Sequence, residues 1–564
     1  MRTLASIKKQ VPVQQILFFF AVVMLLSPAI AWSAADTGFG DSPACPNIKL
    51  NQPVPADGRI VGFGIVPDGG ERVSFLGDLE TDGLFDLFTV PASGGQAPIR
   101  FDIDTPRAQG LTGLPIFSPD GSRAVFRGEF DTEGVRELYS VETTDGGGTA
   151  IKLNGPLIGD VQREFVITPD GTQVVYLAEE LSNLEELYVV PLLGGTSRRI
   201  NNPLKSSDVR DDFQISPDGS FVVYRSRNGS FRTELFSAPL AGGPPVLLND
   251  PLQELGGVLQ FQISPDGSTV VYRSDQEVDN RFDLYQVPIG GGTVERITGS
   301  EVEEGVDDVF GISPDSTHVV YLNPRFVEGD FGIDIYAVDL VGGTPVRLND
   351  PLPAGGFVSD FSIDPSSATV VFEGNAETNQ FLEIFKVSIT GGSVTKLSGD
   401  LSAADGTLGF SISPDGTTVV FGVDRDPGTG AVIQELLAVP LTGGPVRSLA
   451  GPLLPNRRVE QIDYSPDGQS LVYAAETDQD RLELFAVPLD ASASPRRINQ
   501  TLPAGASVEE GFGPVFQFSD DDRYVLFLAD QETVGVTELW SVELACAAAI
   551  DRIFGDGFEE TSIF

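Results

Sequence analysis

The sequence predicts an all-β protein, a β-propeller of ten four-stranded blades. One observation is a unit of four short runs rich in Val, Ile, Tyr and Phe that recurs every 48 to 54 residues. The other is a turn of constant composition between the first two runs of each copy. A period of about 40 to 50 residues with four strands is typical of a propeller, because one small sheet cannot bury both faces and must pack against its neighbours.

The most complete copy of this unit spans Leu259–Ile297. Runs of β-branched and aromatic residues separated by turn residues predict antiparallel strands. The four expected strands are Leu259–Ile263, Thr269–Arg273, Phe282–Pro288 and Thr293–Ile297. Between the second and third strands, Ser274–Arg281 is polar and is expected to be an irregular loop. The glycines 290–292 predict a tight hairpin into the fourth strand.

A Ser-Pro-Asp-Gly turn joins the first two strands of the unit. Pro presets φ for the second position, Asp suits the third and Gly suits the exit, so the residues predict a type I turn with a structural role. The copies with the full Pro-Asp-Gly triplet that we single out are Pro119-Asp120-Gly121, Pro217-Asp218-Gly219, Pro265-Asp266-Gly267 and Pro414-Asp415-Gly416. Two copies are degraded, at 364–367 and 518–522.

The fourth strands determine how the set of blades closes. Nine of them follow the first nine third strands, but none follows the tenth, at Leu539–Leu544. A similar segment, residues 47–51, precedes the first blade. We therefore expect the N-terminal strand to complete the last blade and to close one ring of ten blades. Because more than eight blades are uncommon, two five-bladed lobes are the alternative.

The two cysteines fit a closed ring. Cys45 precedes the closing strand and Cys546 follows the last third strand, in the places where other blades have the two hairpin glycines. A disulfide between them would join the chain ends of that blade, and an exported protein meets the oxidising conditions required.

The termini predict export. Arg2, Lys8 and Lys9 precede an apolar core, Ile16–Leu26, and small residues follow, so residues 1–35 are predicted to be a signal peptide. The core is shorter than the ~20 residues of a spanning helix, which leaves an uncleaved anchor as the alternative. No Cys stands at the cleavage site, so a lipoprotein is not expected. The domain prediction is residues 36–546 for the propeller and 547–564 for a C-terminal tail, in a periplasmic or secreted monomer.

Charge restricts the partners. The chain has 36 basic and 81 acidic residues, a net charge of −45. Nucleic acid and anionic membranes attract Lys and Arg, so both are excluded as expected partners. Long loops between the second and third strands carry many of the acids, and they share one face of the propeller. Binding residues usually lie on loops held by a rigid scaffold, so this long-loop face is the expected docking surface.

Calcium is the one ligand with a local pattern. Carboxylates at alternate positions resemble the start of a calcium loop, and calcium takes six or more oxygens. The candidate ligands are Asp78, Glu80, Asp82, Asp275, Glu277 and Asp279. The other interpretation is that these are solvated loop acids, and no other cofactor is predicted.

The turn, the β-branched strand after it and a Glu-Leu-Tyr-like third strand together resemble the WD40-like PD40 repeats of the TolB propeller family. The resemblance covers roughly residues 47–545. It implies a propeller of the cell envelope that binds proteins. TolB proteins have six blades and a separate N-terminal α/β domain, whereas this sequence has ten copies and no such domain.

No catalytic constellation is recognisable. Peptidases with similar blades carry a Gly-x-Ser-x-Gly elbow and a catalytic His on a separate domain, whereas the one His here, His318, begins a second strand. We therefore expect a non-enzymatic binding or scaffold protein of the envelope, with an envelope or extracellular protein docked on the long-loop face. A glycan-binding propeller, or one that cleaves glycans with carboxylates alone, is the alternative. A blade domain served by a separate hydrolase chain is a further one.

Overall fold

The chain was analysed in a computed structural model. It describes residues 46–544 except 56–57, 70–71, 80–84, 102–109, 112, 144–147, 181, 203–208, 228–231, 254–255, 300–304, 328–329, 378–380, 402–404, 426–431, 451–452, 454, 478–480, 510, 520 and 522. The predicted signal peptide, both cysteines and the predicted tail lie outside the described residues. In the described part, no helix is long and apolar enough to cross a membrane.

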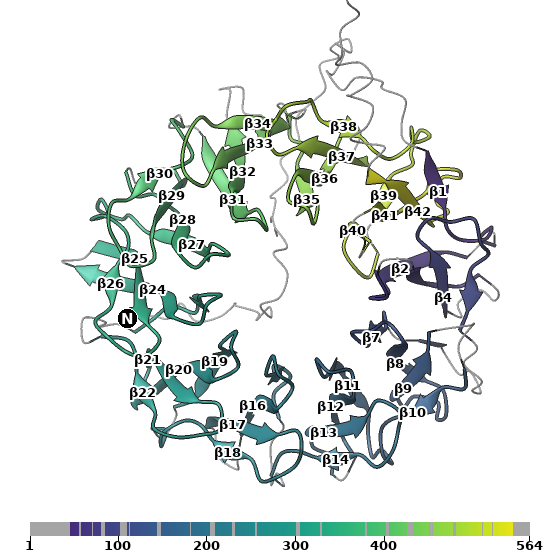
Figure 1. Ribbon diagram of the computed structural model, residues 1–564, viewed down its shortest axis with the longest axis horizontal. Coiled ribbons are helices and arrows are strands. Elements are labelled where there is room, and N and C mark those ends of the chain that lie inside the picture. The colour runs from purple at the N-terminus through teal and green to yellow at the C-terminus, as the bar shows by residue number, and fades with distance from the viewer. Residues whose placement is uncertain are drawn as a thin grey trace, which may run out of the picture. The chain divides into compact units, whose positions relative to one another are not determined.

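The strands form ten sheets, which follow one another along the chain as the predicted blades (Figure 1). Blades 1 to 5 are built as follows: β2 Ile60–Ile65, β3 Arg72–Gly77, β4 Asp86–Pro91 and β5 Ile99–Arg100; β6 Gly110–Leu111, β7 Ile116–Phe117, β8 Arg123–Glu129, β9 Glu137–Glu142 and β10 Ile151–Lys152; β11 Val161–Ile167, β12 Gln173–Ala178, β13 Glu186–Pro191 and β14 Arg198–Arg199; β15 Gln214–Ile215, β16 Phe221–Arg227, β17 Thr233–Pro239 and β18 Val246–Leu247; β19 Val258–Ile263, β20 Thr269–Val278, β21 Arg281–Pro288 and β22 Glu295–Arg296.

Blades 6 to 10 complete the set: β23 Phe310–Ile312, β24 His318–Val327, β25 Asp330–Asp339 and β26 Val346–Arg347; β27 Val358–Ile363, β28 Thr369–Gly374, β29 Glu383–Ser388 and β30 Thr395–Lys396; β31 Gly406–Ile412, β32 Thr418–Arg425, β33 Ile433–Pro440 and β34 Arg447–Ala450; β35 Val459–Tyr464, β36 Ser470–Glu476, β37 Leu482–Pro488 and β38 Arg496–Arg497; β39 Val508–Glu509, β40 Phe516–Phe518, β41 Tyr524–Ala529, β42 Glu538–Glu543 and β1 Asn47–Lys49.

Within each blade, neighbouring strands in sequence pair antiparallel, with the first strand on the inside and the fourth on the outside (Figure 1). Because strand direction alternates, the turns after the first and third strands lie on one face, and the loops after the second and fourth lie on the other. In blades 2 and 10 the inner strand is split, into β6 and β7 and into β39 and β40.

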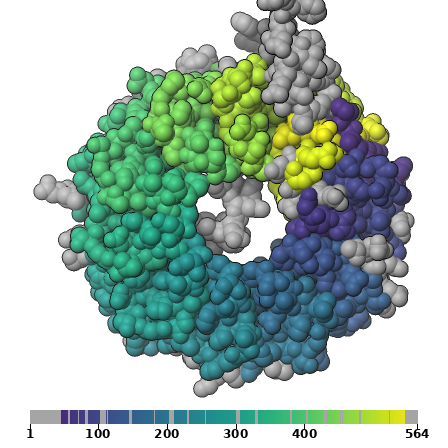
Figure 2. All heavy atoms as spheres, in the orientation of Figure 1, coloured from purple at the N-terminus to yellow at the C-terminus, as the bar shows by residue number. Residues whose placement is uncertain are grey.

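Ten hydrophobic clusters in the described residues each join two consecutive blades. Val271 of blade 5 packs with Val319 of blade 6, the junction that two five-bladed lobes would break. Leu526 of blade 10 packs with Phe75 of blade 1. The blades therefore form one closed propeller, in the order that the colours follow in Figure 2.

The N-terminal strand closes the last blade, as predicted. β1 pairs antiparallel with β42, with Ile48 opposite Ser541. The side chain of Asn51 accepts a hydrogen bond from the amide of Leu539 at 2.8 Å. Ten blades with an outer strand borrowed from the N-terminus are thus confirmed.

A cation on the outer strand neutralises a buried acid at the start of the third strand in seven blades. Cations on an exposed edge strand also discourage edge-to-edge pairing with other sheets. In blade 3, the Glu186 carboxylate lies 3.0 Å from the Arg199 guanidinium, and the Glu186 side chain is almost fully buried. The other six pairs are Lys49–Glu538, Arg100–Asp86, Lys152–Glu137, Arg296–Asp283, Lys396–Glu383 and Arg497–Glu483. A buried acid is costly without such a partner, so the pairs hold the outer strands in register.

The expected loop Ser274–Arg281 in blade 5 is irregular but shorter than predicted. β20 and β21 extend into it: their pairing shifts register between Ser274 and Val278 and resumes at Val278 and Arg281, across the two-residue turn Asp279-Asn280. Asn280 has a φ of 60°. Asn tolerates this left-handed conformation, which a two-residue hairpin turn requires, so a polar composition did not exclude pairing here.

Candidate functional site

The hairpin of blade 6 projects beyond most of the corresponding hairpins. β24 and β25 have ten residues each, against six in each of β12 and β13 of blade 3. Their pairing continues without a bulge from His318 and Asp339 to Val327 and Asp330. This hairpin joins the second and third strands, so it lies on the long-loop face.

The base of this hairpin is fixed to blade 7. Ile333 forms a β-bridge with Phe357 in the connection to that blade. Gly332 lies so close to the carbonyl oxygen of Gly356 that a Cβ atom would approach it to 2.7 Å. The Arg325 guanidinium lies 3.2 Å from the Asp334 carboxylate across the two strands. The hairpin is therefore a supported element and not a free loop.

Two aromatic residues lie near its tip. Phe326 and Phe331 are directly opposite each other, with ring centroids 5.0 Å apart. Their side chains are 57% and 47% exposed, whereas the stacked aromatic pair Tyr321 and Tyr336 in the same blade is largely covered. Exposed aromatic side chains on a rigid support are typical of the residues that contribute most to a protein interface.

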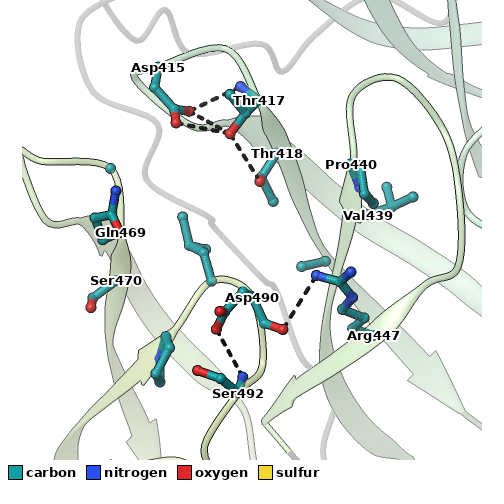
Figure 3. A pocket seen from close by; sticks show the side chains of 14 residues that line it. Asp415, Thr417, Thr418, Val439, Pro440, Arg447, Gln469, Ser470, Asp490 and Ser492 are labelled. Carbon is teal, nitrogen blue, oxygen red and sulfur yellow. Dashed lines mark hydrogen bonds between the residues drawn. The ribbon is translucent and has the colours of Figure 1, made fainter. Parts of the chain in front are cut away.

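A pocket of about 670 Å³ lies between blades 8 and 9 (Figure 3). It is lined by the first turn of each blade, including Asp415 and Gln469, and by the last turn of blade 9, including Asp490. These turns belong to the face opposite the long loops. This pocket is thus not on the face that the sequence favoured for binding.

A smaller pocket of about 250 Å³ lies between blades 3 and 4, on the long-loop face. Arg210 and Arg227 line it together with Glu164, Glu185 and Asp211. Burial lowers the pKa of Arg210, and the positive charges of Arg227 and Arg225 lower it further. With two guanidiniums and three carboxylates, the lining of the pocket has a net charge of −1.

The predicted calcium ligands are occupied by the protein itself where the structure describes them. Asp78 accepts a hydrogen bond from the amide of Arg59. Asp275 accepts the amide of Gly257 at 2.7 Å and that of Asn280 at 3.2 Å. The Glu277 carboxylate lies 2.9 Å from the Arg296 guanidinium.

Asp279 lies in the turn of the blade 5 hairpin, while Glu80 and Asp82 lie outside the described residues. Among the side chains that the structure describes, no three of His, Cys, Asp and Glu are grouped so as to hold a metal ion. Calcium at these loops stays a prediction.

The Pro-Asp-Gly turns hold the first two strands of each blade together. In the turn of blade 5, the amide of Gly267 donates to the carbonyl of Ser264 at 2.8 Å, and the Ser264 hydroxyl donates to Asp266 at 2.6 Å. Gly267 has a φ of 73°. The corresponding residues of the other turns singled out above, 119–121, 217–219 and 414–416, repeat the bonds to Asp and the positive φ of Gly.

The same conformation persists where the sequence is degraded: Ser367 occupies the glycine position with a φ of 63°.

His318 is held at the beginning of β24 in blade 6. Its Nε2 atom lies 3.1 Å from the Asp339 carboxylate, and its Nδ1 atom lies 2.7 Å from the Thr317 hydroxyl. Asp339 is the residue paired with it on the neighbouring strand. These are contacts within one hairpin, at the end remote from the long-loop face.

Sequence reasoning missed both the aromatic hairpin and the blade 8–9 pocket. A signal existed for each. Phe326 and Phe331 flank Glu328-Gly329, a sequence that suits a hairpin turn. At the pocket, Arg447 stands where blades 2, 4, 6 and 10 have Ile or Val and blades 3 and 9 have Arg. Ser448 lies opposite Leu437, as Arg199 lies opposite Tyr188 in blade 3, so Arg447 is the counterpart of Arg198.

Comparison with known proteins shows no family for this chain. The sequence matches no established protein family and no curated protein. Similar solved structures include a protein assigned as TolB from Agrobacterium tumefaciens, with 22% identity over 46% of this chain and 86% of that one (TM-score 0.26).

Two further similar structures are enzymes. The dipeptidyl peptidase 4 of Porphyromonas gingivalis has 12% identity over 74% of this chain and 64% of that one (TM-score 0.45). The oligogalacturonate lyase of Vibrio parahaemolyticus has 12% identity over 77% of this chain and 96% of that one (TM-score 0.36). At these identities and scores the similarities add nothing to the assignment of a function.

Proposed function

We propose that this protein is an exported, non-catalytic scaffold of the cell envelope that binds another protein through the blade 6 hairpin on its long-loop face. The observation that carries the proposal is the exposed pair Phe326 and Phe331 on a hairpin anchored to the neighbouring blade. An anchored hairpin loses little conformational entropy on binding. Little of the free energy gained from its aromatic contacts is therefore offset.

The charge of the chain indicates the kind of partner. With a net charge of −45, the protein repels acidic proteins and attracts basic ones, especially at low ionic strength. The proposed partner therefore combines an apolar patch, which covers the two phenylalanines, with basic residues around it.

The test begins with identification of the partner. Wild-type protein would be used to capture proteins from an envelope extract, and the captured protein would be purified for binary titration. Replacement of both aromatic residues, Phe326→Ser with Phe331→Ser, should weaken binding by about 30-fold or more, the effect of losing an interface hot spot. Because both side chains are exposed, the melting temperature should change little.

Phe512 provides a matched control. It is also an exposed phenylalanine, 67% exposed, but it lies in blade 10. Phe512→Ser should bind as the wild type does. Equal affinity of the hairpin variant and the wild type would reject the hairpin as the docking element. An acidic captured partner whose binding does not weaken with salt would reject the electrostatic part of the proposal.

A further inference from the structure

One outer-strand position beside the pocket between blades 8 and 9 differs in residue type among the blades, and it is an arginine in blades 3 and 9 as well as in blade 8. In blades 2, 4, 6 and 10 the residue at this position is aliphatic and fills the space under the last turn of the next blade. The four residues and the turn glycines that they touch are Ile151 and Gly194, Val246 and Gly291, Val346 and Gly391, and Ile48 and Gly94.

Blade 8 has Arg447 at this position, opposite Ala438. Its guanidinium does not fill the space but spans it, and Nη1 donates to the carbonyl oxygen of Asp490 at 3.3 Å (Figure 3). The residues that begin the second strands of the two blades, Thr418 and Ser470, are small, as Thr269 and Thr369 are in blades 5 and 7, whereas blade 4 has Phe221 there. These two hydroxyl side chains line the pocket together with Arg447.

The lining alternates hydrogen-bond donors and acceptors above an apolar floor. Arg447 and the Gln469 amide are donors, and the hydroxyls of Thr418 and Ser470 act in both roles. The floor consists of Ala438, Val439, Pro440, Pro488 and Leu489. Aromatic and thiol side chains do not occur among the lining residues of this pocket.

The two carboxylates of the lining stay ionised at neutral pH. Hydrogen bonds from the side chain and amide of Ser492, with a contribution from Arg447, lower the pKa of Asp490. Burial acts to raise the pKa of Asp415, but hydrogen bonds from Ser413 and Thr417 outweigh it and lower that pKa. With one guanidinium and two carboxylates, the lining has a net charge of −1.

We propose that this pocket binds a neutral, polyhydroxylated ligand, a mono- or disaccharide. Ionised carboxylates and a guanidinium accept from and donate to vicinal hydroxyl groups, while the apolar floor contacts the C–H face of a sugar ring. The volume lies within the range of small-molecule sites, about 300–1,000 Å³. The net negative charge disfavours phosphates, uronic acids and other anions.

Titration of the full-length protein with glucose, galactose, mannose, maltose, cellobiose and glucuronate would test this. Saturation-transfer NMR would detect the bound sugar, and calorimetry would measure its affinity. At least one neutral sugar should bind saturably, and glucuronate should bind more weakly than glucose. No saturable binding by any neutral sugar, or tighter binding of glucuronate, would overturn the proposal.

Arg447→Val is the decisive variant, because it introduces the side chain that blades 4 and 6 have at this position. It should fold with an unchanged melting temperature and should bind sugar at least about ten-fold more weakly, since a charged donor is lost and the space is filled.

Arg198→Val is the matched control. Arg198 has the same position in blade 3 and donates to the carbonyl oxygen of Leu240 at 2.7 Å. This variant should keep sugar binding. Full binding by Arg447→Val, or an equal loss in Arg198→Val, would show that the sugar binds elsewhere. The pocket and the aromatic hairpin lie at opposite ends of the strands, so either assignment can fail without the other.

Discussion

Blades 2 and 10 hold their outer strands by the same contacts, but only in blade 2 is that strand a continuation of the blade. Lys152 pairs with Glu137 in blade 2, as Lys49 pairs with Glu538 in blade 10. Asn154 accepts the amide of Leu138 at 2.7 Å, and its counterpart in blade 10 makes the same bond at 2.8 Å. In blade 10 the strand comes from the other end of the chain.

The difference teaches where the propeller can open. A covalent turn keeps the outer strand of blade 2 near its partner even when the contacts break. β1 has no such turn, so when the predicted disulfide is reduced it is held by non-covalent contacts with three blades. Asn47 donates to the carbonyl oxygen of Ile498 in blade 9 at 2.9 Å, and Ile48 packs against Gly94 in blade 1. In the reduced protein, local opening without global unfolding is therefore easier at β1.

Removal of the cysteines should have the largest effect. Asn47, which follows Cys45 by two residues, lies opposite Val542, which precedes Cys546 by four. The disulfide is predicted at this end of the two paired strands. Cys45→Ser or Cys546→Ser should lower the free energy of unfolding by about 4–5 kcal/mol at most, because the disulfide closes a very long loop. Denaturant titration would measure this. A peptide map without reductant that lacks a Cys45–Cys546 link would contradict the prediction.

Lys49→Met and Lys152→Met compare the two blades at the buried acid. Each leaves a glutamate, 4% exposed, without its ammonium partner, at a cost of about 3 kcal/mol. Both should lower the melting temperature. In the reduced protein, only Lys49→Met should also make the N-terminal segment sensitive to limited proteolysis, because only there can the strand leave without breaking a covalent connection. Similar cleavage of both variants would remove the distinction between the blades.

Asn51→Ala and Asn154→Ala make a smaller and cleaner comparison. Each leaves one buried amide without an acceptor, that of Leu539 or that of Leu138, at about 1–3 kcal/mol. Hydrogen exchange of these amides would measure the opening. In the reduced protein, the amide of Leu539 should gain more exchange in Asn51→Ala than the amide of Leu138 gains in Asn154→Ala. Equal gains would mean that the hairpin turn adds nothing to the hold on the outer strand.

Alkaline pH should have the smallest effect. Burial alone would lower the pKa of Lys49, but hydrogen bonds and charge attraction from Glu538 and Glu532 outweigh it and raise that pKa above 10.5. A raised pKa in the folded state means that the stabilisation is complete below pH 10.5 and is lost as the pH rises through the folded value.

The free energy of opening at β42, obtained from exchange rates corrected for base catalysis, should therefore fall above that pH in the wild type. Solvent screens these partly exposed ammonium groups, so the change should be modest. Lys49→Met should show no such step, and a step of the same size in that variant would assign it to another group.

Much of the fold was predictable because its signals are local. The Pro-Asp-Gly turns and the alternation of β-branched residues repeat in each copy, so blade number follows from counting them. The missing tenth outer strand, and its substitute at residues 47–51, follow from the same count. Nothing in this inference required knowledge of which blades touch.

The functional surfaces were not predictable in the same way. Ser274–Arg281 has a loop-like composition but pairs as strands, because the partner strand and a turn with Asn280 in the left-handed conformation supply the pairing. The two phenylalanines near the blade 6 tip were passed over because exposure depends on how far the hairpin extends from its neighbours.

By itself, the sequence determined the repeating unit, the number of blades and the strand that closes them, since each depends on residues near one another in the chain or on their count. The tertiary structure alone decided where the candidate binding surfaces lie. The outer strand of blade 8 places Arg447 against blade 9, where it donates to the carbonyl oxygen of Asp490, and an anchored hairpin keeps Phe326 in solvent. Register and exposure depend on contacts with neighbouring blades, and those contacts cannot be inferred from the residues of one repeat.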